Sequence, residues 1–150
     1  MKPFPPVLLA ISMLLVYLLS RAASQTNLGP VYDIAALFYV GWGLVVFGVL
    51  SVLAMIRKFK KNDTTVLPNG MPTQLMTDGI YAYSRNPIYV FMVIALLGVV
   101  MINGALIGLT VIPVFIALVQ TLWISFEEAQ LEKAFGQAYL DYKAKVRSWI

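Results

Sequence analysis

The chain contains no cysteine and no histidine, and it is poor in charge of either sign. The absence of cysteine excludes disulfide bonds, a thiolate nucleophile and iron–sulfur ligation. The absence of histidine removes the commonest general base and the commonest ligand of metals and haem. We therefore expect no metal site. Any catalysis must proceed without a Ser-His-Asp, Cys-His or histidine–metal arrangement.

Composition points to a membrane protein. Charged residues make up 12% of the 150 residues, and apolar residues make up 60%. Soluble domains average about 25% charged and about 45–50% apolar residues, so this chain cannot cover a soluble surface of its own size. The mean hydropathy of +0.81 agrees. The same numbers exclude intrinsic disorder, and the length allows one domain.

Four apolar stretches are separated by polar segments. A bilayer core of about 30 Å is crossed by about 20 helical residues. Two of the stretches are long enough alone, and the other two reach this length with flanking residues. The sequence thus predicts an all-α integral membrane fold with four transmembrane helices at about residues 4–20, 32–56, 87–102 and 105–126.

The basic residues are distributed unevenly around these segments. With four spans, ten of the eleven basic residues fall on one side of the membrane, and Arg21 alone falls on the other. The positive-inside rule then places both termini and the loop at residues 57–86 in the cytoplasm. Orientation accounts for the net charge of +4 without a nucleic-acid partner. A cleaved signal peptide over residues 1–24 is an alternative for the N-terminus, but it would lose this sorting.

The segment at residues 127–143 has a different pattern from the spans. Apolar side chains recur there at the spacing of one helical face. They are Leu131, Phe135, Ala138, Tyr139 and Tyr142. This spacing predicts an amphipathic helix that lies on the cytoplasmic interface or caps the bundle.

The loop at residues 57–86 is too long for a simple connector, and loops of this length are usually functional or disordered. It ends at Asn86 and Pro87, which favour the N-cap and the first position of a helix. The free N–H groups and positive dipole end of that helix could receive a carboxylate. An interfacial aromatic belt is the simpler interpretation of Tyr81 and Tyr89.

Glu127 and Glu128 form a second candidate cluster directly after the fourth predicted span. Adjacent carboxylates repel each other and oppose the dipole of a helix that ends there, whereas a helix that begins there would favour them. A solvated acidic helix start is the simpler interpretation. The functional one is that one carboxylate binds a cation or a hydroxyl donor and the other pairs with Arg85. A tight hairpin at residues 103–104 would bring these clusters together.

Five segments, in this order, resemble the isoprenylcysteine carboxyl methyltransferase and phospholipid methyltransferase family of integral membrane enzymes, in particular its short bacterial members. The resemblance extends roughly over residues 60–150. The matching segments are residues 64–68, 75–81, 85–89, 127–131 and 135–149.

The resemblance implies transfer of a methyl group from S-adenosylmethionine to a lipophilic acceptor that enters from the bilayer, either a prenylcysteine-like carboxylate or a phospholipid amine. It implies a cytoplasmic cofactor cleft covered by the C-terminal helix, in a bacterial inner membrane. Its cofactor-binding residues here are Leu75, Tyr81, Arg85, Asn86, Pro87, Tyr89, Glu127 and Glu128. For this reaction we expect Arg85 and Glu127 to be the catalytic residues.

This chemistry suits a chain without histidine or cysteine, because methyl transfer from a sulfonium needs alignment more than acid–base catalysis. A carboxylate acceptor needs no base at neutral pH. An amine acceptor must lose a proton, for which Glu127 and Tyr89 are the candidates. Arg85 could orient an anionic acceptor by a bidentate contact.

Two positions depart from the family pattern. Isoprenylcysteine enzymes usually have histidine where this chain has Asn86, whereas asparagine occurs there in broader bacterial and phospholipid-type members. Family members often have an arginine in the turn before the glutamate pair, which here is residues 123–126.

A haem or redox accessory protein and a small four-helix transporter are the alternative functions. A transporter should show an ionisable residue inside a span, and Asp33 lies only at a span edge.

Overall fold

The structure, a computed structural model, describes residues 5–26, 32–61 and 73–150, without the side chains of residues 59–61. Within these ranges every regular element is helical, which confirms the predicted all-α fold. The start of the first predicted span and the segment at residues 64–68 lie outside the described residues.

Three helical segments are long and apolar enough to cross a membrane, namely Pro5–Gln25, Ala35–Lys58 and Leu106–Phe135. They correspond to α1 (Pro5–Gln25), most of α2 (Ala35–Lys61) and a rod of consecutive helical elements. The third predicted span is α3 (Pro87–Asn103), a shorter apolar helix of 17 residues. Its crossing of the membrane stays a prediction.

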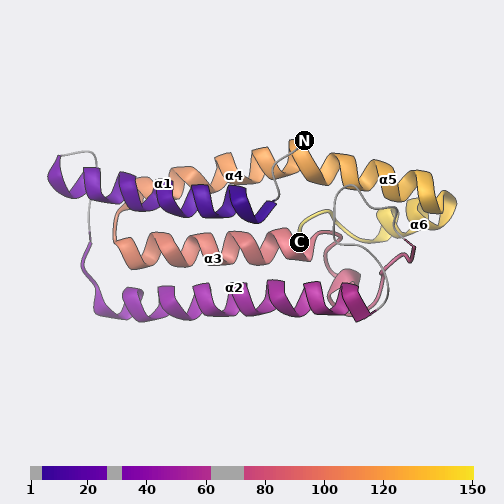
Figure 1. Cartoon of the computed structure of the whole chain (residues 1–150), viewed down its shortest axis with the longest axis horizontal. Helices are drawn as coiled ribbons and strands as arrows, with labels where there is room; N and C mark the ends of the chain where they lie inside the picture. Colours follow the sequence, from indigo (N-terminus) through magenta and orange to yellow (C-terminus); the bar gives the residue numbers. More distant parts are fainter. Residues whose placement is uncertain (1–4, 27–31, 62–72) are drawn as a thin grey trace.

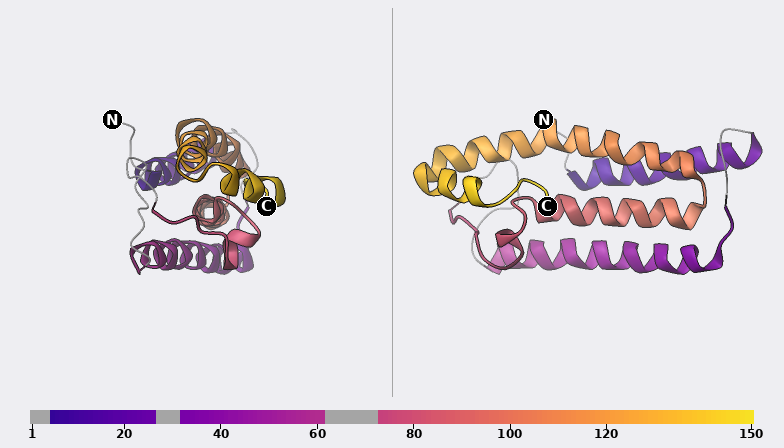
Figure 2. Two further views of the ribbon diagram at one scale, coloured as in Figure 1. Left: turned by 90° about the vertical axis from the view of Figure 1, so that its right-hand side faces the viewer. Right: turned by 180° about the vertical axis from the view of Figure 1, so that it is seen from behind.

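The bundle has α3 in its middle layer, with α2 on one side and α1 and α4 on the other (Figures 1 and 2). The buried core follows this arrangement, because α3 supplies its centre and the rod and α1 cover it. Its members are Val16 from α1, Tyr89, Met92, Leu96 and Val100 from α3, and Val111, Phe115, Val119, Trp123 and Ile124 from the rod.

The rod contains η2 (Leu106–Thr110), α4 (Val111–Val119), a π-helical turn η3 (Gln120–Ile124) and α5 (Ser125–Phe135). The glutamate pair therefore lies in the first turn of α5, inside a continuous rod, and not at the start of a separate helix at residue 127. The rod ends at Gly136, whose φ of +53° disfavours a side chain. Beyond it, α6 (Gln137–Lys145) turns back (Figure 1).

Glycines set the contact between α2 and α3. A Cβ on Gly41 would lie 2.7 Å from the carbonyl oxygen of Gly98, and one on Gly98 would lie 2.5 Å from that of Gly41. Gly48 approaches the Phe91 carbonyl equally closely. Close packing of the two helices is thus possible because these positions lack a side chain, whereas Gly43 faces open space.

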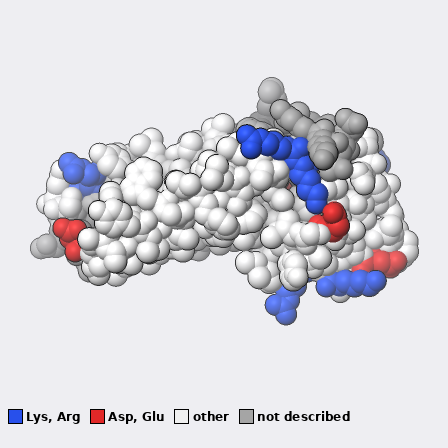
Figure 3. All heavy atoms as spheres, turned by 90° about the horizontal axis from the view of Figure 1, so that it is seen from below, with Lys and Arg blue, Asp and Glu red and all other residues white. Residues whose placement is uncertain are grey.

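The surface agrees with a position in a bilayer. Many large apolar side chains of α1 and α2 are exposed, among them Ile11, Leu14, Trp42, Phe47 and Leu50. Seen from below, charged side chains gather toward the ends of the molecule and leave a long uncharged region (Figure 3). Such a surface is stable against lipid and not against water. The chain is therefore an integral membrane protein.

Candidate functional site

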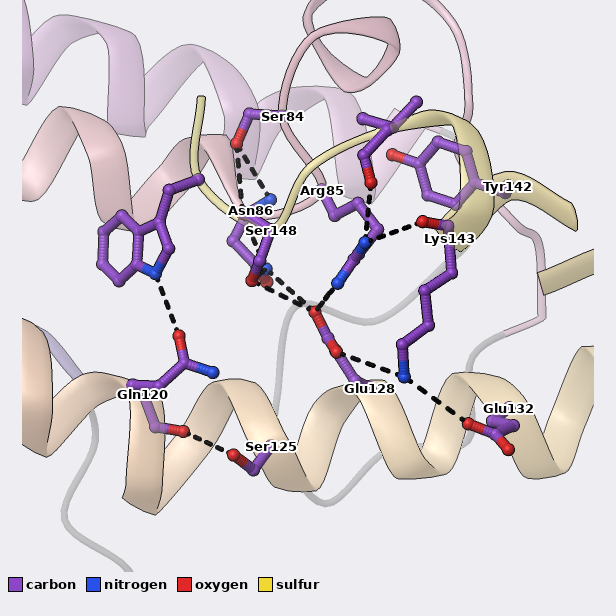
Figure 4. A network of polar contacts seen from close by, with 12 residues as sticks. Ser84, Arg85, Asn86, Gln120, Ser125, Glu128, Glu132, Tyr142, Lys143 and Ser148 are labelled. Carbon is purple, nitrogen blue, oxygen red and sulfur yellow. Dashed lines mark hydrogen bonds and ion pairs between the residues drawn. The ribbon is translucent and has the colours of Figure 1, made fainter. Parts of the chain in front are cut away.

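Four segments from two distant parts of the sequence meet at one end of the bundle. They are the start of α3, the first turn of α5, α6 and the last five residues, 146–150, which we call the tail (Figures 1 and 4). The hairpin between α3 and the rod brings the first two together, as the sequence predicts. The break at Gly136 returns α6 and the tail to the same place.

The start of α3 is built as predicted, with Asn86 at the N-cap and Pro87 in the first turn. The Asn86 side chain, however, makes no capping hydrogen bond. Its amide instead donates to the carbonyl and hydroxyl oxygens of Ser148, at 3.1 Å each. The Ser84 hydroxyl accepts from the Asn86 backbone N–H at 3.2 Å. Asn86 therefore links the helix start to the tail.

Glu128 is the centre of the polar network (Figure 4). Its Oε1 accepts from Arg85 Nη2 at 2.7 Å, from Arg85 Nε at 3.2 Å and from the Ser148 hydroxyl at 3.2 Å. Its Oε2 lies 3.7 Å from Lys143 Nζ. The side chains of Arg85 and Glu128 are only 10% and 14% exposed. A buried ion pair is tolerated only with such additional hydrogen bonds.

The remaining part of the Arg85 guanidinium contacts the end of α6. Nη1 donates to the carbonyl oxygens of Val146 at 2.6 Å and of Lys143 at 3.2 Å. The C-terminal end of a helix has unpaired carbonyl groups and a negative dipole end, so a cation is favoured there. Arg85 thus joins α3, α5 and α6 through one side chain.

Glu127 has a different partner from Glu128, because neighbouring residues of a helix point in directions about 100° apart. Its Oε1 accepts the hydroxyl of Tyr89 at 2.9 Å. Tyr89 is 5% exposed and belongs to the core. The prediction that one glutamate binds a hydroxyl donor while the other pairs with Arg85 is confirmed.

Tyrosines of α6 close the other side of the network. The Tyr142 hydroxyl donates to the Tyr81 carbonyl at 2.6 Å, which fixes η1 (Gly79–Ala82) against α6. Burial raises the pKa of Tyr142 to about 12, and the Arg85 charge opposes this rise. Tyr139 is fully buried, and its hydroxyl lies beside the Arg85 guanidinium. Burial also raises the pKa of Tyr139.

The structure brings together most of the predicted site residues. Arg85, Asn86 and Glu128 share one network, and Tyr89 with Glu127 lies beside it. Pro87 is fully buried at the helix start, and Tyr81 is joined to α6 by the hydrogen bond from the Tyr142 hydroxyl to its carbonyl. Leu75 is half-buried before η1, outside these hydrogen bonds. The predicted cofactor cleft adjoins a loop whose residues 62–72 lie outside the described residues.

Sequence reasoning missed three polar residues of the network, which are Ser84, Lys143 and Ser148. Lone serines and a surface-type lysine have no pattern that would mark them as site residues. Only the resemblance at residues 135–149 indicated that the end of the chain matters. In the described ranges, no group of three or more Asp, Glu, His or Cys is arranged to hold a metal ion.

Comparison with known proteins adds the family. The sequence profile of the family described as phospholipid methyltransferase matches residues 36–138, which is more than half of the chain. The chain belongs to the phospholipid methyltransferase family. The match includes Arg85, Asn86, Tyr89 and both glutamates and ends before Tyr142 and the tail.

One curated relative of this family member is the protein-S-isoprenylcysteine O-methyltransferase of Schizosaccharomyces pombe, which is 40% identical over 76 residues. The aligned part is 51% of this chain and 32% of the relative, so the chain spans about a third of that protein's length in the match. No solved structure matches the chain.

Proposed function

We propose that this protein is an S-adenosylmethionine-dependent methyltransferase that modifies a lipophilic acceptor at the cytoplasmic face of a bacterial inner membrane. The observation that supports it best is the coincidence of the family match with the buried network, because the matched segment contains both glutamates and the Arg85–Tyr89 helix start. The positive-inside rule supports the orientation, since the network lies at the end of the bundle that carries Lys58, Lys143 and Arg147.

The residues present fit the proposed cofactor. S-adenosylmethionine has a carboxylate and two positively charged groups, and the network offers both carboxylates and cations. Glu127 would face the positive groups, and Lys143 would face the carboxylate. The buried Tyr139 hydroxyl, beside Arg85, is a further hydrogen-bonding group for a bound ligand. Asn86, Pro87, Leu75 and Tyr81 would form the walls.

When bound, the cofactor supplies the methyl group from its sulfonium, and the chain supplies alignment. Tyr89 and Glu127 lie where α3 enters the apolar core, which is the side from which a lipid-like acceptor would arrive. A carboxylate acceptor needs no base. An amine acceptor would transfer its proton to Glu127, which the Tyr89 hydroxyl holds in place at 2.9 Å.

Arg85 has a more specific role in this proposal than the sequence suggested. Its side-on contact through Nε and Nη2 is made with Glu128, and Nη1 is occupied by two carbonyl groups. It is therefore positioned to neutralise Glu128 and to shape the site, and an anionic acceptor would have to compete with Glu128 for it.

The test is calorimetric titration of S-adenosylhomocysteine into detergent-purified protein. We expect micromolar binding by the wild type and its loss in Glu127→Gln and Asn86→Ala. Asp141→Asn is the matched control, because this exposed carboxylate pairs only with Gln137 among the described contacts. Absence of binding by folded wild-type protein would refute the proposal.

The acceptor class is tested separately with labelled S-adenosylmethionine. One arm offers a farnesylcysteine analogue, and the other offers vesicles of phosphatidylethanolamine. Labelled product in the first arm alone identifies a carboxylate acceptor, and product in the second alone identifies an amine. The amine reaction should slow as the acceptor amine and its base become protonated, whereas the carboxylate reaction should keep its rate until the acceptor carboxylate itself is protonated, at about pH 4.

A further inference from the structure

The tail crosses the site and is fixed at each of its middle residues. The Arg147 carbonyl accepts from the Arg85 backbone N–H at 3.0 Å. The Ser148 carbonyl accepts from Asn86 Nδ2 at 3.1 Å and from the Ser84 hydroxyl at 3.4 Å. These contacts place the Ser148 hydroxyl between Asn86 and Glu128, where it donates to Glu128 at 3.2 Å.

A second anchor lies deeper, on the membrane rod. Trp149 Nε1 donates to Gln120 Oε1 at 2.9 Å, and the indole packs partly buried against the core. Gln120 is the first residue of the π-helical turn, and its carbonyl accepts the Ser125 hydroxyl at 2.8 Å. A half-buried glutamine in an apolar rod is costly unless it is paired, and Trp149 supplies the pair.

The two anchors leave Ser148 little freedom. It lies between Arg147, which is held by α3, and Trp149, which is held by the rod. If Trp149 were released, Ser148 would lose one of its two fixed neighbours, and its hydroxyl would no longer be directed at Glu128. Single-turn π-helices occur frequently at functional sites, and this one offers the glutamine that binds the tail.

We propose that Gln120 and Trp149 are positioning residues of the candidate site, whose hydrogen bond fixes the tail so that Ser148 orients Glu128 and Asn86. This inference rests on the proposed function, because it assigns the tail to the same cofactor site. It adds a segment that lies outside the family match, which ends at residue 138.

A double-mutant cycle tests the coupling. Gln120→Met removes the acceptor at similar volume, and Trp149→Phe keeps an aromatic ring without the donor. Because one hydrogen bond contributes about 0.5–1.5 kcal/mol, each variant should weaken S-adenosylhomocysteine binding by about 2- to 12-fold. The double variant should be no weaker than the worse single one. Gln137→Met and Trp42→Phe, which make the same exchanges at exposed sites, should leave binding unchanged.

A spectroscopic measurement separates positioning from simple packing. The chain has no cysteine, so Ile150→Cys gives a single labelling site at a side chain that is 78% exposed. A nitroxide there should be more mobile with Gln120→Met than in the wild-type background, because the backbone beside it loses its anchor. Ser148→Ala should weaken binding by a similar factor without raising the mobility of the label, because the Trp149–Gln120 hydrogen bond is intact.

The outcomes are distinguishable. The inference is overturned if Gln120→Met, Trp149→Phe and Ser148→Ala all bind as tightly as the wild type although the label in Gln120→Met is more mobile. The proposed function would then still stand. Additive losses in the double variant also overturn it, since the two side chains would then act separately. Folded wild-type protein that does not bind overturns the proposed function, and the positioning role with it.

Discussion

The two ends of α3 are held by different kinds of contact. In its middle and second half, Gly98 packs against Gly41, and backbone meets backbone without a polar side chain. At its start, Arg85 and Asn86 make a dense set of hydrogen bonds to Glu128 and the tail. The same helix therefore takes part in a membrane contact that depends on shape and in a site that depends on charge.

This difference predicts how each region responds to substitution. In a bilayer, apolar side chains gain little by leaving lipid, so close packing decides the strength of helix contacts. In a buried polar network, the stability depends on the direction and pairing of the hydrogen bonds, and a single unpaired charge costs more than a lost apolar contact. Volume changes should thus disturb the α2–α3 contact, and volume-conserving changes should disturb the site.

Arg85→Met is expected to have the largest effect, because it leaves the Glu128 carboxylate buried without its main partner. Breaking a buried pair costs about 3–5 kcal/mol of stability. Thermal unfolding in detergent measures it, with Arg147→Met as the exposed control. Adding Glu128→Met should restore part of the loss. If Arg85→Met alone is as stable as the wild type, the ion pair contributes nothing.

Gly98→Ala comes next and tests the other region. The new methyl group would lie 2.5 Å from the Gly41 carbonyl oxygen, so the helices must separate. Overpacking of this kind costs about 1–3 kcal/mol. Gly43→Ala, which faces open space, should be neutral or stabilising, since alanine favours helix by about 1 kcal/mol over glycine. Binding of S-adenosylhomocysteine by the folded protein should not change in either variant.

Tyr89→Phe should have a smaller effect on stability and a larger one on the site. It removes the hydroxyl that donates to Glu127 at 2.9 Å and keeps the ring in the core. A hydrogen bond to a charged group contributes about 1.5–3 kcal/mol, and water can replace part of it because Glu127 is only half-buried. Comparison of S-adenosylhomocysteine affinity with the unfolding temperature would separate the two effects. Small and matching decreases in affinity and in unfolding temperature would argue against a role of Tyr89 at the site.

The helices of the membrane region were largely predictable from the sequence, since the length of an apolar stretch reports directly on a membrane helix. The site was predictable where residue types imply partners, as with Arg85 and the glutamate pair. The sequence predicted that one glutamate pairs with Arg85 and the other binds a hydroxyl donor, but not which one does which. That assignment depends on the rotation of α5 about its axis. That rotation includes the extra residue of a π-helical turn that no sequence pattern showed.

The helix boundary after the fourth span was predicted at residue 127 because the composition changes there from apolar to charged. Backbone conformation does not follow that change, since every residue from Val114 to Phe135 can continue a helix. The break occurs at Gly136, where the chain needs a positive φ. Ser148 and Gln120 were not predictable, because their roles come from contacts 20 or more residues away in sequence.

The smallest expected effect concerns Tyr142, whose hydroxyl donates to the Tyr81 carbonyl. Its pKa rises from 10 to about 12 on folding because the phenol is buried. The neutral form is thus favoured in the folded state, so the stabilisation is complete below pH 10 and is lost as the pH rises toward 12. Tyr142→Phe should lower stability by about 1 kcal/mol at neutral pH through the lost hydrogen bond. It should also flatten the decline above pH 10, measured by unfolding in detergent. Tyr81 and Tyr139 shift in the same direction, so part of the decline should persist. An unchanged slope would show that the Tyr142 phenol is solvated, and the contact between η1 and α6 would then be looser than the 2.6 Å hydrogen bond indicates.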